Sequence, residues 1–177
     1  MSRPLKRLRP VTDSTAQRLE DSTTQDSPRA SHKDSCNIQA HALSVLRLVA
    51  FPTQTRRSTM VDETRKTHRG LPLGLNLAYC RGVGVSRFTR RYEKLARFLC
   101  KFVCNSNPGF SFTTIQLNKN HAAALHVDSS NLGPSRVIGL GEFTGGELYI
   151  HGAGRLDIRD AWHEFDGNMP HLTCPFQ

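Results

Sequence analysis

Long apolar runs are missing from this sequence of 177 residues. The apolar patch at residues 42–51 contains Arg47 and is far too short to span a bilayer. The basic start of the chain is not followed by the apolar core of a secretory signal, and Asp13, Glu20 and Asp21 argue against a transit peptide. We therefore expect an intracellular protein, cytoplasmic or nuclear, with no membrane partner.

Cysteine is scarce and irregularly spaced. The chain has five cysteines, at positions 36, 80, 100, 104 and 174, and no two of them form a CxxC pair. An odd, scattered set argues against a disulfide framework and against a zinc knuckle. A reducing compartment is the natural inference.

Acidic residues are scarce in the front of the chain, so the formal charge of +9 is unevenly distributed. Residues 1–105 contain 20 Lys or Arg and 8 Asp or Glu, whereas residues 106–177 contain 4 and 7. A basic segment can steer a protein toward nucleic acid or another anionic surface. Net charge governs how fast a protein meets charged partners and how soluble it is, and it does not show which reaction the protein catalyses. It therefore does not decide the function.

Residues 1–70 are rich in Ser, Thr, Asp and Arg and poor in large apolar side chains. Such a segment buries too little surface to offset the entropy of ordering, so we expect a disordered, basic tail. The patch at residues 42–51 leaves two alternatives open, a short helix and wrongly assigned sequence. One folded domain is expected over residues 71–177.

An amphipathic helix is expected after Ser86, a residue type favoured at N-caps. Apolar residues recur there at intervals of three and four, at Phe88, Tyr92, Leu95, Leu99, Phe102 and Val103. Basic residues occupy the other face, at Arg87, Arg90, Arg91, Lys94, Arg97 and Lys101. The apolar face should lie on a core, and the basic face is better explained by solvation than by phosphate contacts.

The apolar pattern changes to period two at residue 110. Short β-rich runs follow at residues 110–117, 124–128, 136–141, 147–151, 155–159, 162–165 and 171–176, separated by Gly, Asn and Pro turns. Many short strands at close spacing predict a mainly β domain, a sandwich or a jelly roll, behind the helix.

Three residues of the β region match the ligand set of a mononuclear non-haem iron site. His126 and Asp128 are two positions apart, so on an extended strand they would face the same side, and His171 offers a second imidazole. A 2-His-1-carboxylate set leaves open metal positions for a cosubstrate and dioxygen. The tripeptide alone is weak, because a chain with 8 His and 15 acidic residues can contain it by chance.

Further motifs stand in order around these residues. His126-Val127-Asp128 is followed by Gly-Gly-Glu-Leu at 145–148 and by Phe-Asp-Gly-Asn-Met-Pro-His at 165–171. Residues 72–177 thereby resemble the Fe(II)/2-oxoglutarate-dependent dioxygenases, especially algal and viral-type members related to prolyl hydroxylases and the TET/JBP nucleobase dioxygenases. The resemblance implies a double-stranded β-helix, the jelly-roll or cupin-like fold.

The resemblance also implies a cofactor and a reaction. His126, Asp128 and His171 would bind Fe(II), which 2-oxoglutarate chelates and where dioxygen takes the remaining position. Decarboxylation to succinate and carbon dioxide is coupled in this family to hydroxylation of a C–H bond. The sequence does not identify the substrate, and a protein side chain, a nucleobase and a small molecule all remain open.

Other residues have less specific expectations. Asn118 lies where related enzymes contact 2-oxoglutarate, although it would equally well shape its turn. Thr173, two positions after His171, should face the same pocket as a cofactor-binding residue. His151 and His163 lack the turn that precedes the family's distal ligand, so we expect them on the surface or in packing.

The final residues depart from the family. The basic residue that anchors the 5-carboxylate of 2-oxoglutarate on the strand after the distal His has no counterpart in residues 172–177. We expect a β-helix truncated at its C-terminus, with an exposed sheet edge and weak cosubstrate binding. Two alternatives follow: an oxygenase domain, whose activity as this truncated chain stays open, or a non-catalytic remnant that binds an acidic partner such as nucleic acid.

Overall fold

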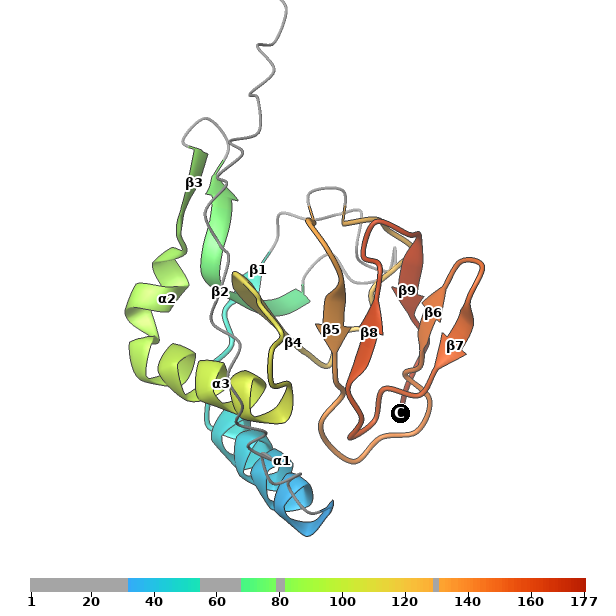
Figure 1. Ribbon diagram of the computed structural model, residues 1–177, viewed down its shortest axis with the longest axis horizontal. Coiled ribbons are helices and arrows are strands. Elements are labelled where there is room, and N and C mark those ends of the chain that lie inside the picture. Colours follow the sequence, from blue (N-terminus) through green and yellow to red (C-terminus); the bar gives the residue numbers. More distant parts are fainter. Residues whose placement is uncertain (1–31, 55–67, 79–81, 129–130) are drawn as a thin grey trace, which may run out of the picture.

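The computed structural model describes residues 32–54, 68–78, 82–128 and 131–177, which form helices and small antiparallel sheets (Figure 1). The helices are α1 (His32–Arg47), α2 (Arg87–Arg91) and α3 (Glu93–Ser106). The strands are β1 (Thr53–Gln54), β2 (His68–Ala78), β3 (Gly82–Val85), β4 (Thr114–Lys119), β5 (Ser135–Val137), β6 (Leu148–Ile150), β7 (Gly154–Leu156), β8 (His163–Phe165) and β9 (His171–Thr173). The predicted mainly β architecture behind an amphipathic helix is confirmed. In this part of the chain, no helix has the length and apolar character needed to cross a membrane.

The amphipathic helix begins where the sequence predicts. Ser86 is the N-cap, and its hydroxyl oxygen accepts a hydrogen bond from the Phe88 amide at 3.2 Å. Tyr92, with φ of −116°, departs from helical geometry and divides the predicted helix into α2 and α3. The predicted apolar face is buried on both sides of this break, at Phe88, Leu95, Ala96, Leu99, Phe102 and Val103.

A first core joins this helix to the sheet formed by β1, β2, β3 and β4. β2 and β4 are antiparallel, with Leu71 opposite Leu117 and Leu73 opposite Ile115. Leu71 and Leu73 are 0% and 2% exposed. Full burial of a leucine side chain contributes about 1.5–3 kcal/mol, so this face of β2 is a main source of stability. We call the elements α1 to β4 the N-terminal half.

Part of the expected tail belongs to this half, which corrects the boundary at residue 70. α1 lies within residues 1–70, and its residue Ala42 is completely buried in the first core. The Tyr92 hydroxyl also donates to the carbonyl oxygen of Ala50, at 3.1 Å, just beyond α1. Composition misled here because a few apolar residues suffice when they lie on one helical face. Residues 1–31 lie outside the described residues, and for them the tail stays a prediction.

The C-terminal half, residues 123–177, forms two small sheets around a second core. β5 pairs with β8, while β6 pairs with both β7 and β9, and all of these pairs are antiparallel. The second core contains the buried residues Leu148, Ile150 and Ile158, against which Val137, Leu156 and Phe165 pack. Side chains from both sheets contribute to this cluster, so the sheets face each other across it.

Strands in this half are shorter than the predicted runs. The run at 124–128 contributes only an isolated bridge, between His126 and His171. Gly145 and Gly146 have φ of +76° and +77°, a conformation that favours glycine. A Cβ at Gly145 would also collide with the carbonyl oxygen of Pro175. The predicted tight turn at these glycines is wrong: Gly145 pairs with Phe176 and the Gly146 amide donates to the Pro175 carbonyl oxygen, so both glycines lie along the pairing with the C-terminal residues.

Candidate metal centre

Backbone pairing brings together two histidines that are 45 positions apart in sequence. The His126 amide donates to the His171 carbonyl oxygen at 3.0 Å, and the His171 amide donates to the His126 carbonyl oxygen at 2.9 Å. This reciprocal exchange is the close pair of an antiparallel ladder, in which the two side chains project to the same side. The ring centroids lie 4.3 Å apart. The predicted association of His126 with His171 is therefore present in the fold.

Asp128 is held beside the histidines by a turn of the chain before β9. Its amide donates to the Gly167 carbonyl oxygen at 2.8 Å, and its own carbonyl oxygen accepts from the Asn131 amide at 3.1 Å. Gly167 is buried, and a Cβ there would lie 2.5 Å from Asn131 Nδ2 and 3.5 Å from Asp128 Cβ. A side chain at position 167 would therefore displace the end of Asn131, while Asp128 Cβ would lie at an ordinary contact distance.

The backbone also fixes which nitrogen of each imidazole is free. His126 Nδ1 lies 2.7 Å from the Ala124 carbonyl oxygen, and His171 Nδ1 lies 2.8 Å from the Met169 carbonyl oxygen. A carbonyl oxygen only accepts, so each Nδ1 carries the hydrogen, and in the neutral ring Nε2 keeps its lone pair. Both histidines are oriented in the same way, by the carbonyl two residues earlier. This is the outer hydrogen bond that a metal-binding histidine normally makes.

The three side chains lie close together, and small side-chain movements would bring their ligand atoms to one metal ion. One ligand atom from each of His126, Asp128 and His171 can be chosen so that all lie within 4.8 Å of one another. His126 Nε2 and Asp128 Oδ1 are 3.9 Å apart. Metal bonds of about 2.0–2.2 Å place neighbouring ligands about 3 Å apart, so this pair must close by about 1 Å. The Asp128 side chain is 41% exposed, which leaves it room to rotate. Two nitrogens and one carboxylate suit Fe(II), and zinc sites use similar donors.

One side of the site is shielded from solvent, and the opposite side is exposed. His171 is 4% exposed, and the Phe165 ring meets its imidazole edge to face at a centroid distance of 5.1 Å. The side chain of His126 is 13% exposed, much less than that of Asp128. Water and small ligands therefore reach the three ligand atoms from the Asp128 side. An ion at this place would have protein on one face and free positions on the other.

The two predicted cofactor-binding residues lie in different sheets. Thr173 is on β9, two positions after His171, and its amide donates to the Ala123 carbonyl oxygen at 3.0 Å, in the ladder that pairs the histidines. Asn118 is on β4 in the other sheet, exposed, and its side-chain oxygen accepts from Gln116 Nε2 at 3.0 Å. Thr173 therefore shares a strand with His171, and its facing the same pocket stays a prediction. Contact of either residue with 2-oxoglutarate stays a prediction.

Residues that sequence reasoning missed act through their backbone or their small size. The carbonyl oxygens of Ala124 and Met169 orient the imidazoles, and Gly167 leaves room for the end of the Asn131 side chain. Only the Phe-Asp-Gly turn before His171 offered a signal for one of them. Two other histidines of the β region were not expected to be ligands. His151 is exposed at a turn, as expected, and His163 lies on β8 opposite Val137.

The cysteine pair on α3 has different chemistry. Cys100 and Cys104 are exposed and one helical turn apart. Burial of its sulfur, and then the neighbouring Cys104, raise the pKa of the Cys100 thiol above its ordinary 9.0. Cys100 therefore stays protonated at neutral pH, and a protonated thiol is a poor nucleophile and metal ligand. Of the described residues, the histidine and aspartate cluster is the better candidate.

Comparison with protein-family models, with curated proteins and with solved structures found no match to this chain. The residues and their geometry therefore carry the functional argument by themselves.

Proposed function

We propose that residues 123–177 form the metal-binding part of a non-haem Fe(II)- and 2-oxoglutarate-dependent dioxygenase that hydroxylates a C–H bond of its substrate. The observation that carries this proposal is the convergence of His126, Asp128 and His171 into one cluster with both Nε2 atoms free. A facial set of two imidazoles and one carboxylate with open positions is the ligand arrangement of this enzyme class. The identities of the metal and the cosubstrate rest on the sequence resemblance.

The order of strand pairing supports the double-stranded β-helix. His126 pairs with His171, Arg136 with Glu164, and Tyr149 with Arg155, so the pairs are nested around the turn between β6 and β7. Nested antiparallel pairs define one long hairpin. β6 also pairs with β9, so the hairpin curls back on itself and forms two sheets. The second core fills the space between these sheets. A jelly roll is such a rolled antiparallel hairpin in two sheets.

Each of the chain's own residues would have a distinct role at the metal ion. His126 and His171 would present Nε2 to the ion, Asp128 would add a carboxylate oxygen, and the carbonyls of Ala124 and Met169 would hold the imidazoles. When bound, Fe(II) and 2-oxoglutarate supply the oxidative decarboxylation that yields succinate and carbon dioxide and hydroxylates the substrate. Ligands would enter from the Asp128 side, because Phe165 closes the His171 side.

Release of succinate tests the proposal without knowledge of the substrate. The full chain is supplied with Fe(II), dioxygen, ascorbate and millimolar 2-oxoglutarate, a concentration that offsets weak anchoring of the 5-carboxylate. Ascorbate supplies the two electrons that the C–H bond of a substrate would otherwise provide. We expect slow release that stops when Fe(II) is omitted and in His126→Ala. The matched control is His151→Ala, which removes an exposed imidazole next to a turn and should leave the rate unchanged. Equal rates in His126→Ala and the native chain, or no release from the native chain, would refute the proposal.

A further inference from the structure

α2 and α3 carry a stripe of exposed cations, which we call the basic stripe. It consists of Arg87, Arg90, Arg91, Lys94, Arg97 and Lys101, all exposed. Glu93 is the one acidic residue of the two helices. At 1.5 Å per residue, the stripe covers about 7 Å of α2 and about 13 Å of α3, in two segments separated at Tyr92. It is therefore long enough to meet several charges of an extended anion.

Most of this charge has no acidic partner in the described part of the chain. Arg97 pairs with Glu93 at 2.8 Å, and both side chains are largely exposed, so the pair is weak and screened. Arg87 and Arg91 lie over the rings of Phe88 and Tyr92, at 4.8 and 5.7 Å from the ring centroids. These rings restrict the guanidinium groups without neutralising them. Arranged cations of this kind attract phosphates.

The opposite face of these helices is already occupied. Leu95, Leu99 and Phe102 are buried in the first core. A helix that lies on a membrane needs a free apolar face to insert, and α3 has none to offer. Phe88 and Tyr92 are likewise buried or half-buried, so they offer no open ring on which a base could stack. The available contacts are therefore ionic ones to a sugar-phosphate backbone, which carry no sequence information.

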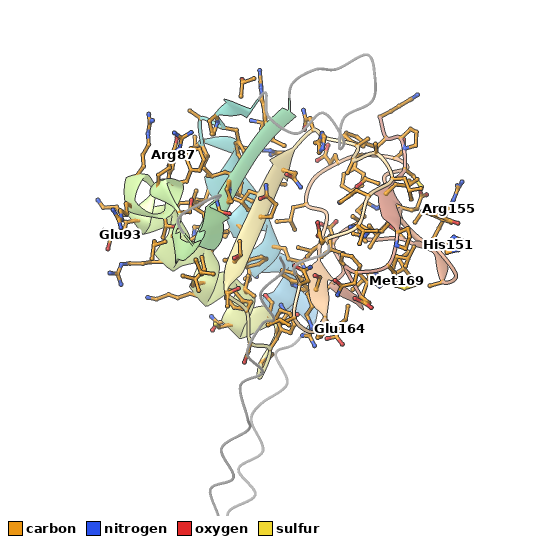
Figure 2. All side chains as sticks on the ribbon, turned by 90° about the horizontal axis from the view of Figure 1, so that it is seen from above. Arg87, Glu93, His151, Arg155, Glu164 and Met169 are labelled. Carbon is orange, nitrogen blue, oxygen red and sulfur yellow. The ribbon has the colours of Figure 1, made fainter. Side chains whose placement is uncertain are left out.

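The basic stripe lies far from the candidate metal centre. Figure 2 shows Arg87 and Glu93 at one end of the molecule and His151, Arg155 and Met169 at the opposite end. Met169 belongs to the metal-centre end, because its carbonyl oxygen binds His171 Nδ1. The acidic residues of the chain are relatively more frequent in residues 106–177, so an anion is steered toward the helices. The stripe is thus a separate surface.

We propose that the basic stripe binds the phosphate backbone of nucleic acid without reading its sequence. This function is additional to the metal chemistry and independent of it. Each cation that meets a phosphate releases a counterion, so affinity should fall steeply with salt. The stripe would hold the chain on a nucleic acid and leave the metal-centre end exposed.

Fluorescence anisotropy of the full chain with a labelled 20-nucleotide DNA of mixed sequence, single-stranded and duplex, tests this surface. We expect Arg90→Glu/Arg91→Glu to weaken binding at least 10-fold at 100 mM salt, and to lower the slope of log affinity against log salt by about 2. Lys94→Glu/Lys101→Glu is an independent pair on the same stripe and should act in the same direction. All four positions are exposed, so the thermal unfolding midpoint should stay unchanged.

The matched control compares single reversals of charge. Arg155 is exposed on β7 at the opposite end, so Arg155→Glu should change the affinity less than 2-fold, whereas Arg90→Glu should weaken it several-fold. His126→Ala should bind DNA like the native chain, which separates this proposal from the metal chemistry. Equal losses in Arg155→Glu and Arg90→Glu, or binding that ignores salt, would overturn the proposal. Binding to phosphatidylserine vesicles without binding to DNA would also overturn it.

Discussion

The N-terminal and C-terminal halves differ in how they are stabilised. The first core contains nine buried residues, whereas the second contains three. β2 has 11 residues and pairs along most of β4, while every strand from β5 to β9 has 3. The candidate metal ligands nevertheless lie in the weaker half. Stability and chemistry are thus placed in different parts of the chain, as expected when sites are drawn from regions that open readily.

A metal ion bound at this site would have a structural role in the C-terminal half. His126 and Asp128 lie on one arm of the rolled hairpin and His171 on the other, so an ion held by all three would join the two arms. A ligand that binds only the folded state stabilises that state by mass action. The C-terminal half should therefore depend on metal for stability, and the N-terminal half should not.

The largest expected effect is the loss of core packing in the N-terminal half. Leu73→Ala removes a side chain that is 2% exposed and should lower the free energy of unfolding by about 3–5 kcal/mol. Ile150→Ala, the matched change in the second core, should lower it by less, because fewer buried neighbours surround that site. Urea denaturation followed by circular dichroism measures both. Equal losses would contradict the difference between the two halves.

Metal addition should produce the next largest effect. At a concentration 100-fold above its dissociation constant, an ion bound only by the folded state stabilises it by about 2.7 kcal/mol. Amide hydrogen exchange should show this protection in residues 123–177 and leave β2 and α3 unchanged. Asp128→Ala should abolish the protection. Uniform protection of both halves, or protection that persists in Asp128→Ala, would argue against a metal-joined hairpin.

Gly167→Ala should weaken metal binding only a few-fold, because the added Cβ displaces the end of the Asn131 side chain, whereas Asp128 Cβ lies at an ordinary contact distance. Gly84→Ala is the matched control, since a Cβ there meets nothing within 4 Å and position 84 does not have the left-handed φ that favours glycine. Isothermal titration with Fe(II) under anaerobic conditions measures the affinity. A dissociation constant that is the same in Gly167→Ala and Gly84→Ala would show that the Asn131 side chain beside Gly167 does not affect the metal ligands.

The smallest effect concerns one of several contacts between the halves, because other side chains of the C-terminal half also pack against the first core. Arg136 on β5 forms a salt bridge to Glu164 at 2.9 Å, donates to Asn107 Oδ1 at 2.9 Å beyond α3, and lies over the Phe110 ring at 4.5 Å. Arg136→Met should cost about 1 kcal/mol, because the ion pair is partly exposed and screened. Calorimetry should show a lowered unfolding midpoint in Arg136→Met, whereas Arg155→Met should leave the midpoint unchanged. An unchanged midpoint in Arg136→Met would show that this side chain does not stabilise the contact between the halves.

Local and periodic features of the fold could be predicted from sequence. The helix after Ser86, its buried face and the His126, Asp128 and His171 set follow from spacing and capping, which depend on side-chain identity. A short helix is one of two alternatives that the sequence leaves for the patch at residues 42–51, and α1 contains residues 42–47 of that patch. The start of α1 at His32 and its burial could not be predicted, because the burial depends on contacts with a helix more than 40 residues later. The roles of Ala124, Met169 and Gly167 also escaped, since backbone carbonyls and a missing Cβ leave no distinctive residue type.

Anaerobic titration of the full chain with Fe(II) tests the central claim most directly. The geometry predicts one Fe(II) per chain, with binding lost in His126→Ala, Asp128→Ala and His171→Ala and retained in His151→Ala. Without metal, the ligand variants should keep the amide hydrogen exchange of the metal-free native chain in residues 123–177, which would show that lost binding is not lost folding. A native chain that binds no Fe(II), or an affinity that is the same in Asp128→Ala, would contradict the claim.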